Sequence, residues 1–186
     1  TYNKVLSRFK KKRILVIGDL ILDRYIWGKV TRISPEAPVP IVEVTEENVL
    51  LGGASNVAHN IVALGARATV AGLSGNDRGG EIIAKMLEEK GIRCEGVFRS
   101  GRPTTVKTRV IAHSQQVVRF DREDRGRIDG TIMKSLLKYI TGEIPKHDAV
   151  ILSDYKKGVI SSDLLKEVVR SAGPGNIFVA VDPKVG

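Results

Sequence analysis

The sequence predicts a doubly wound α/β fold, in which a mostly parallel sheet with helices on both faces carries a small antiparallel β lid. The first observation is four short apolar runs rich in Val and Ile: ILVIG (14–18), ATVAGL (68–73), AVIL (149–152) and IFVAVD (177–182). Continuous runs of this kind are typical of parallel strands that are buried on both faces. The other two observations are helical patterns between these runs and two stretches that alternate like exposed strands.

Four segments place apolar residues at helical spacing, and each is followed by a glycine that can end a helix. They are 54–64, 77–90, 130–141 and 162–172. Asp77 stands where an N-cap is expected. Strands that alternate with helices in this way predict the doubly wound sheet.

Two stretches interrupt this alternation, at about 24–45 and 104–121. In the second stretch Val106, Thr108 and Val110 share one face, whereas Lys107 and Arg109 share the other. HSQQ is a plausible turn between two strands. These pieces predict a small second sheet, a lid that covers a site or makes a dimer contact.

Length and composition indicate one globular domain. The chain has 186 residues, of which 42% are hydrophobic, and contains no apolar run long enough to span a bilayer. The N-terminal residues carry charges without an apolar signal core, so export is not expected. The single Cys94 cannot form an intrachain disulfide, which favours a cytoplasmic location. Cys94 itself is expected to be an inert strand residue.

The formal net charge of +9 first suggests nucleic acid or a membrane surface as a partner. However, most basic residues are scattered, and the run RFDREDRGR (119–127) is interleaved with acids. Aromatic residues make up 5% of the chain, too few for a base-stacking platform. Neither partner is therefore expected. Most of these charges are interpreted as solvated, and some could hold a small anionic substrate.

Polar residues follow each of the four apolar runs. The strand ends read Gly18-Asp19, Ser74-Gly75, Ser153-Asp154 and Asp182-Pro183-Lys184. Asp and Ser are also common turn residues. Because ligands of open α/β sheets bind at the carboxyl ends of the strands, four such ends together predict a polar cleft there.

The segment GGASN (52–56) precedes a predicted helix but lacks the Lys and Ser/Thr of a Walker A loop. No G-x-G-x-x-G fingerprint is present, so a nucleotide phosphate site is not supported here. Bare backbone at Gly52 and Gly53, the amide of Asn56 and the carboxylate of Asp19 suit a polyhydroxylated ligand. An ordinary helix N-terminus, with Ser55 or Asn56 acting locally, explains the pattern equally well.

The pattern Gly52-Gly53-Ala54-x-Asn56-x-Ala58, followed by Gly65 and Gly75, resembles the first signature of the ribokinase/PfkB family of carbohydrate kinases. The resemblance covers essentially the whole chain and implies a ribokinase-like fold with a β lid. Several longer segments are similar to the branch that phosphorylates D-glycero-β-D-manno-heptose 7-phosphate. They are GDLILDRYIWGKVTRISPEAPVPIVEV, QQVVRFDRE, LSDYKKG and DPK. That branch is often the N-terminal part of a bifunctional protein that makes ADP-heptose for lipopolysaccharide.

The resemblance implies transfer of the ATP γ-phosphoryl group to the anomeric hydroxyl of the heptose phosphate. Asp19 matches the hydroxyl-binding aspartate of the family, and Gly52, Gly53 and Asn56 match its sugar-binding turn. Asp23 belongs to the branch motif and is expected either to reach a further hydroxyl or to be structural.

The substrate's phosphate needs cations, and family members that take phosphosugars tend to use basic lid residues. Lys107 and Arg109 are therefore the first candidates. Arg32, Lys157 and Lys184 are secondary candidates, each more typical of a solvated charge. Asp154 is expected to bind substrate or to cap the next turn. The residues interpreted as lying outside the site are His59, His113, His147 and Trp27, the last as packing within the lid.

The second family signature, a glycine-rich GAGD region with the catalytic aspartate, is not found in residues 1–186, nor is an Asn-x-x-Glu element for metal and phosphate. These residues are thus expected to be the N-terminal portion of the kinase domain, with the C-terminal part of the fold missing and the base downstream of Gly186. No catalytic residue or metal ligand is assigned in the chain. The complete enzyme would use ATP and Mg²⁺, but no tightly bound cofactor is expected, and the chain alone is predicted to be inactive.

Two alternatives remain open. One is a PfkB-family kinase for another sugar or phosphosugar. The other is a sugar-binding module that forms a homodimer through the β lid and has no catalytic role.

Overall fold

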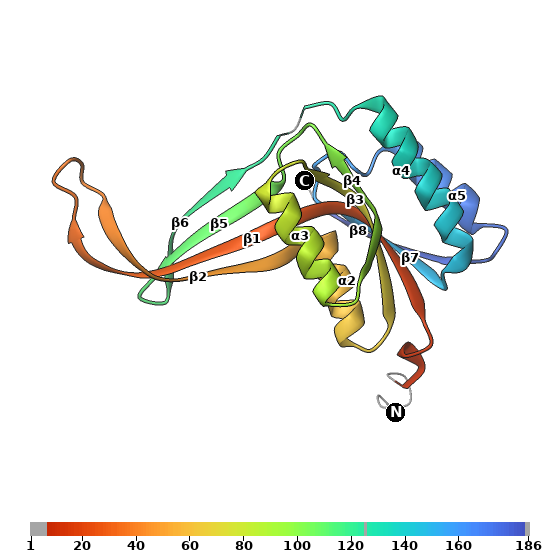
Figure 1. The fold of residues 1–186 in the computed structure, drawn as a ribbon, viewed down its shortest axis with the longest axis horizontal. Coiled ribbons are helices and arrows are strands. Elements are labelled where there is room, and N and C mark those ends of the chain that lie inside the picture. The colour runs from red at the N-terminus through yellow and green to blue at the C-terminus, as the bar shows by residue number, and fades with distance from the viewer. Residues whose placement is uncertain (1–6, 125, 185–186) are drawn as a thin grey trace.

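The computed structural model describes residues 7–124 and 126–184, and these form one eight-stranded sheet with two differently built regions (Figure 1). The first region, called the body, holds the helices and a parallel sheet. The second, called the arm, consists of residues 20–33, β2, β5 and β6. Strand β1 (Arg13–Ile33) runs through both regions.

The sheet of the body has the strand order β4-β3-β1-β7-β8, and all its neighbours are parallel. The strands that join β1 are β3 (Arg67–Gly75), β4 (Arg93–Ser100), β7 (Ala149–Asp154) and β8 (Phe178–Pro183). The four predicted strands are thus confirmed, but the predicted burial on both faces is wrong for β8, whose residues are exposed or half-buried because it pairs with β7 at the edge of the described sheet. Strand β4, which contains Cys94, was not predicted as a separate element.

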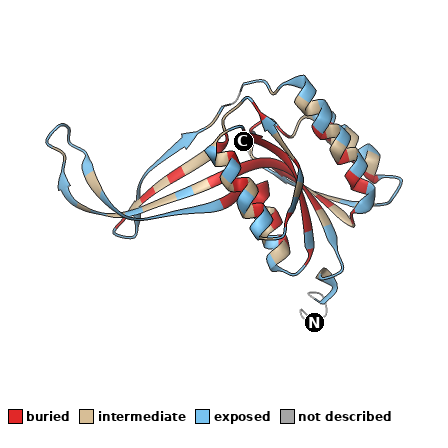
Figure 2. Ribbon diagram, viewed as in Figure 1, coloured by how far each residue is buried: buried red, intermediate tan, exposed pale blue. Residues whose placement is uncertain are grey.

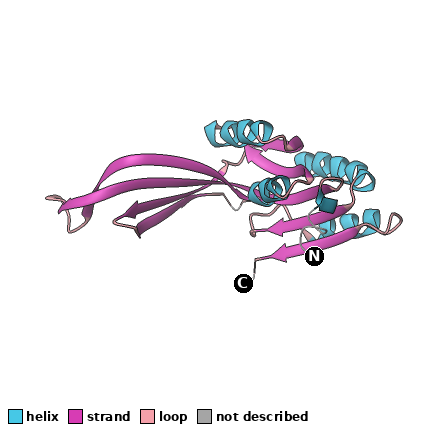
Figure 3. Ribbon diagram, turned by 90° about the horizontal axis from the view of Figure 1, so that it is seen from below, coloured by secondary structure: helices cyan, strands magenta, loops and turns pink. Residues whose placement is uncertain are grey.

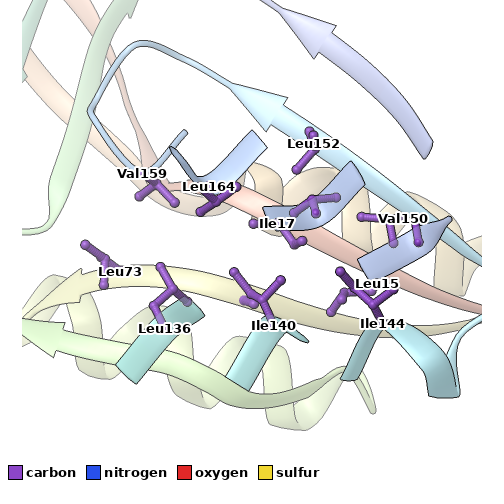
Figure 4. Close-up of a cluster of buried hydrophobic side chains, with 13 residues drawn as sticks. Leu15, Ile17, Leu73, Leu136, Ile140, Ile144, Val150, Leu152, Val159 and Leu164 are labelled. Carbon is purple, nitrogen blue, oxygen red and sulfur yellow. The ribbon is translucent and has the colours of Figure 1, made fainter. Parts of the chain in front are cut away.

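Helices cover both faces of this sheet, as the sequence predicted. The helices are α2 (Ala54–Ala63), α3 (Arg78–Glu89), α4 (Gly130–Glu143), the 3₁₀ turn η1 (Ile144–Lys146) and α5 (Ser162–Ala172). Side chains alternate along β1, so Leu15 and Ile17 pack with α4 and α5 whereas Val16 packs with α2 and α3. Figure 4 shows Leu136 and Ile140 of α4 in the first of these two cores.

The arm extends away from the helices (Figures 1 and 3). Residues 20–33 of β1 pair with β2 (Pro40–Gly53) antiparallel and with β5 (Thr105–Ala112) parallel. Strand β6 (Gln115–Arg122) pairs antiparallel with β5. His113 and Ser114 form the turn with φ of 50° and 63°, which matches the predicted HSQQ turn.

Two boundaries differ from the sequence prediction. The first strand does not end at Gly18 but continues without a break to Ile33, and β2 extends to Gly53 rather than ending near residue 45. Gly18-Asp19 looked like a strand end because a glycine followed by an acid is typical of turns. Burial follows the division into regions, since buried residues concentrate in the body and exposed ones in the arm (Figure 2).

In the described part of the chain, no helix has both the length and the apolar character that crossing a membrane requires.

Candidate functional site

The carboxyl ends of β1's body half, β3, β7 and β8 lie at one edge of the sheet. Gly18 is opposite Ser153, Asp19 is opposite Leu73, and Asp154 is opposite Pro183 in the strand register. The arm leaves the body at this same edge, because β1 continues there into residues 20–33. Polar strand ends and the base of the arm therefore surround one region.

Asp19 is the most buried carboxylate of this region, with an exposed fraction of 1%. It accepts hydrogen bonds from the backbone N–H groups of Tyr155 (2.9 Å), Lys157 (3.0 Å) and Val159 (3.3 Å). Burial raises the pKa of Asp19, and the three N–H donors act in the opposite direction. The carboxylate therefore positions the loop after β7. Its predicted contact with a sugar hydroxyl stays a prediction.

Asp23 and Arg109 form an ion pair between β1 and β5, with 2.6 Å between Asp23 Oδ1 and Arg109 Nη1. The hydrogen bond from this guanidinium to Asp23 also raises the pKa of Arg109. The guanidinium lies 5.3 Å from the ring centroid of Tyr25. Both side chains remain about one-fifth exposed, so Arg109 keeps donors that face solvent. The sequence predicted both residues at the site but did not predict that they pair.

The two glycines of GGASN are explained by the close approach of β2 to β1. A Cβ on Gly52 would lie 2.3 Å from Asp23 Oδ2, and a Cβ on Gly53 would lie 2.3 Å from the backbone oxygen of Asp19. Gly53 also has φ of +55°, a conformation that side chains disfavour. This structural role does not depend on a ligand, and the predicted approach of a sugar to this backbone stays a prediction.

Asn56 lies in the first turn of α2 and is exposed. Among residues 7–124 and 126–184 its side chain has no hydrogen-bond partner, so its amide is available to a ligand. The hydroxyl of the preceding Ser55 is buried and likewise lacks a partner within this described part. The predicted roles of Asn56 thus both remain open.

A cavity of about 340 Å³ lies between the arm and the ends of β7 and β8. This volume is in the range of small-molecule sites. Its polar and charged lining residues are Lys107, Arg119, Asp154, Tyr155, Asp182 and Lys184. Lys107 and Asp154 were predicted site residues, and Lys184 was a secondary candidate.

Lys107 is the cation of this cavity that comes from β5, and its ammonium lies 5.5 Å from the ring centroid of Tyr155. Burial lowers the pKa of Lys107, and the nearby positive charge of Lys157 adds to this effect. A negatively charged ligand beside Lys107 would stabilise its ammonium against both burial and the repulsion from Lys157. Arg119 of β6 was missed, because the run RFDREDRGR was interpreted as solvated charge. The alternation of β6 next to Lys107 and Arg109 was the available signal.

Lys157 does not line that cavity. Its side chain is 7% exposed and forms an ion pair with Glu123, which follows β6. Its backbone oxygen accepts a hydrogen bond from Arg102 Nη1 (2.9 Å). Lys157 and Asp19 instead line a small cavity of about 30 Å³, which has room for one or two water molecules but not for a sugar.

The remaining predictions concern residues outside these cavities. Arg32 is exposed near the outer end of the arm. His113 contacts the backbone of Val30, and Trp27 stacks on Tyr25 with 6.4 Å between the ring centroids. His147 is buried at the opposite edge of the sheet. None of these residues lies at the cavity that Lys107 lines.

One anchor of the arm was also missed. Asp77 caps α3 through Gly80, as predicted, but it also accepts hydrogen bonds from the backbone N–H (3.0 Å) and hydroxyl (2.6 Å) of Thr104. Burial raises the pKa of Asp77, yet these hydrogen bonds together outweigh it and lower the pKa. The start of β5, and with it Lys107, is thereby fixed to the body.

Curated proteins named bifunctional protein HldE are similar to this chain in sequence. The bifunctional protein HldE of Sulfurimonas denitrificans is 45% identical over 182 residues, which are 97% of this chain and 38% of that protein. HldE of Geobacter sulfurreducens is 47% identical over 171 residues, 91% of this chain and 35% of that protein. This chain thus spans little more than a third of these relatives.

Solved structures share the fold. Phosphofructokinase-2 from Escherichia coli, in complex with fructose-6-phosphate, superimposes with a TM-score of 0.69 at 18% identity. The match covers 94% of this chain and 55% of that one. A carbohydrate kinase from Agrobacterium tumefaciens gives a TM-score of 0.66 at 21% identity, with 91% and 53% of the two chains covered.

The sequence profile described as "pfkB family carbohydrate kinase" matches residues 11–184, which is nearly the whole chain. This match confirms the resemblance carried by GGASN and the strand ends. The chain belongs to the pfkB family of carbohydrate kinases.

Proposed function

We propose that this chain provides the sugar-binding part of an ATP-dependent kinase for D-glycero-β-D-manno-heptose 7-phosphate, in the synthesis of ADP-heptose for lipopolysaccharide. The parent enzyme transfers the γ-phosphoryl group of ATP to the anomeric hydroxyl of the sugar. The relatives named HldE, 42–47% identical over more than nine-tenths of the chain, support this choice of substrate.

The cavity that Lys107 lines is the observation that carries the proposal. Three cations, Lys107, Arg119 and Lys184, face it together with the carboxylates Asp154 and Asp182. Cations suit the 7-phosphate, and carboxylates accept hydrogen bonds from sugar hydroxyls. One cavity therefore offers partners for both ends of a phosphosugar. In this proposal Arg109, which pairs with Asp23, and Asn56, at the start of α2, also contact the sugar.

The chemical step requires groups outside this cavity. In the described part of the chain, no cluster of three or more His, Cys, Asp or Glu could hold a metal ion, so these residues assign no position to Mg²⁺. We place the catalytic base downstream of Gly186. The chain alone should then give no turnover with ATP and heptose 7-phosphate, and robust turnover would refute this assignment.

Binding of the sugar can be tested without catalysis. Calorimetry should show that heptose 7-phosphate binds more tightly than the same sugar without its phosphate, and that Lys107→Ala weakens binding by about tenfold or more. Lys85→Ala, on the exposed face of α3, is the matched control and should bind like the unchanged chain. Equal affinity for both sugars would refute the phosphosugar assignment and favour a kinase for another sugar.

We also propose that two copies associate through the arm in the cytoplasm. Large apolar side chains are exposed there, among them Val44 (54%), Leu50 (53%) and Phe120 (54%). Exposed apolar surface of this kind is typical of protein interfaces. Analytical ultracentrifugation should show a dimer that Leu50→Ser or Phe120→Ser converts to a monomer. A monomeric unchanged chain would contradict this association.

A further inference from the structure

The edge of the sheet opposite to the candidate site carries a row of arginines. Three neighbouring parallel strands, β1, β3 and β4, each begin with an arginine: Arg13, Arg67 and Arg93. Arg13 is directly opposite Arg67 in the strand register, and Arg93 is opposite Thr69, two residues further along β3. The parallel register therefore brings three guanidinium-bearing residues to the amino ends of adjacent strands.

These arginines line a cavity of about 290 Å³, together with Lys146 and His147 after α4. We call it the amino-edge cavity. Ala68, Gly91 and the aliphatic stems of the arginines give it apolar walls. Among its described lining residues there is no carboxylate. The cavity is thus concave, cationic at its rim and apolar between the charges.

Carboxylates near the cavity hold some of these cations in place. Glu143 is buried, with 2.7 Å between its carboxylate and Lys146 Nζ and 3.6 Å to Arg93 Nη1. Burial raises the pKa of Glu143, but the hydrogen bond from Lys146 and the positive charges of Lys146 and Arg93 together outweigh burial, so the pKa is lowered overall. Asp148 pairs in the same way with Arg13 (3.8 Å) and with Lys12 (3.1 Å). Arg13, Arg93 and Lys146 therefore have ion-pair partners before any ligand arrives.

Positive charge still exceeds negative charge at this edge. Lys12, Arg13, Arg67, Arg93 and Lys146 are the cations. The carboxylates that pair with them are Glu95, Glu143 and Asp148. Arg67 has no ion-pair partner within residues 7–124 and 126–184, and it is exposed. An anion that enters the cavity would thus meet at least one unpaired guanidinium.

His147 contributes a neutral wall rather than a charge. Its Nδ1 is 2.7 Å from the backbone oxygen of Glu143, and its Nε2 is 2.9 Å from the hydroxyl of Thr69. Burial lowers the pKa of His147, and the positive charges of Arg93 and Arg13 add to this effect. Both ring nitrogens are occupied, so any anion would have to bind the arginines and Lys146.

Helix stabilisation is the competing explanation for these cations. The carboxyl ends of α3 and α4 lie close by in the chain, and positive charge stabilises such ends. That effect accounts for single cations such as Lys146. It does not require a cavity whose described lining lacks carboxylates, nor an arginine at the start of each of three strands.

We propose that the amino-edge cavity binds a small phosphorylated metabolite, whose phosphate contacts Arg67 and Arg93 and whose carbon skeleton lies against Ala68 and Gly91. Planar guanidinium groups hold phosphate oxygens in pairs, which a lysine cannot do. This site is independent of the sugar-binding proposal, because it lies at the opposite edge of the sheet and shares no residue with the cavity that Lys107 lines.

Pyrophosphate is the probe, titrated into ¹⁵N-labelled chain at low salt and followed by NMR. The amide signals of Ala68 and Gly91 should shift and saturate, and Arg67→Ala should weaken that binding by about tenfold or more. Arg93→Ala should weaken it to a similar extent. Arg170→Ala, which breaks an exposed ion pair with Glu167 on α5, is the control and should leave the titration unchanged.

The two cavities are separated by where the signals move. Saturating shifts at Tyr155 and Asp182, without saturation at Ala68 and Gly91, would place pyrophosphate in the cavity that Lys107 lines and would overturn this proposal. Absence of saturation at Ala68 and Gly91, or saturation that Arg67→Ala and Arg93→Ala leave unchanged, would overturn it. Arg67→Lys, which keeps the charge but not the planar fork, should recover only part of the affinity.

Discussion

The two halves of β1 share one continuous strand but differ in almost everything around it. Residues 13–19 lie between β3 and β7, and Leu15, Val16 and Ile17 are fully buried between two layers of helices. Residues 20–33 lie between β2 and β5, and no helix of the described residues covers their outer part, so Trp27 and Ile33 are exposed. Burial on both faces continues through Leu22 at the base of the arm, and beyond that residue the strand is extended mainly by backbone pairing.

This difference suggests a division of work. The body has the packed core that gives a protein most of its stability, and the arm has mainly backbone hydrogen bonds and surface side chains. Asp19 stands where one half changes into the other, and the Lys107 cavity opens beside it. A ligand in that cavity would contact both Lys107 and Arg119 of the arm and Asp154 and Asp182 of the body.

The largest expected effect comes from matched truncations in the two regions. Leu152→Ala, in the core, should lower the free energy of unfolding by about 2–5 kcal/mol. Leu50→Ala removes the same atoms from the arm, where the side chain is 53% exposed. Compared in the Phe120→Ser background, in which the chain is expected to be monomeric, it should change the free energy of unfolding by about 0.5 kcal/mol or less. Urea unfolding measures both values. Similar losses would show that the arm is as tightly packed as the body.

The junction should be next in size. Asp19→Ala leaves the N–H groups of Tyr155, Lys157 and Val159 without their acceptor, and should cost on the order of 2–3 kcal/mol of unfolding free energy. Asp163→Ala, on the exposed start of α5, is the control and should cost little. Unchanged stability of Asp19→Ala would mean that the loop after β7 does not depend on this carboxylate.

A smaller effect is expected where the arm closes onto the body. Glu123 pairs with Lys157, and Lys157 lies close enough to Lys107 to influence its pKa. Without the Glu123 carboxylate, the charge of Lys157 would be less compensated, and the positive potential at the cavity that Lys107 lines would rise. Glu123→Gln should therefore increase the affinity for heptose 7-phosphate by roughly two- to fivefold, measured by calorimetry. Glu89→Gln is the matched surface control, and weaker binding by Glu123→Gln would show that the ion pair serves to position Lys157.

The smallest effect concerns pH and the body. Burial lowers the pKa of His147 below its ordinary 6.5, so the unfolded chain binds a proton at a higher pH than the folded chain does. The contribution of neutral, buried His147 to the free energy of unfolding is therefore fully present above pH 6.5 and is lost as the pH falls through the folded-state pKa. Thermal unfolding at about pH 7.5 and about pH 5.5 should show the loss, and His147→Gln should reduce it. An equal loss in His147→Gln would assign the pH dependence to other groups.

The body was predictable because burial on both faces leaves a local mark. ILVIG, ATVAGL and AVIL are almost entirely apolar and lie buried or half-buried between the two helical layers. IFVAVD forms the largely exposed strand β8 and was found by its apolar run alone. Strand β4 was not predicted because it is an edge strand in which charged residues interrupt the apolar ones. The continuation of β1 beyond residue 18 was not predicted because Gly18-Asp19, in the middle of the strand, is a sequence typical of turns.

The site was less predictable because its contacts join distant parts of the sequence. Lys107, Asp154 and Lys184 could be singled out by position at strand ends and on one strand face. The partners of Asp19 lie 136 to 140 residues away, and those of Lys157 and Arg109 lie 34 and 86 residues away. Local patterns contain no information about such pairs, so the direct roles of Asp19 and Asn56 remain predictions.

Hydrogen exchange, with and without heptose 7-phosphate, tests the central claim most directly. If a phosphosugar connects the two regions, amides of β5, β6 and residues 153–159 should gain protection, while the core strands of the body stay slow in both states. Absence of protection in the arm, or protection confined to the amino edge of the sheet, would contradict the account.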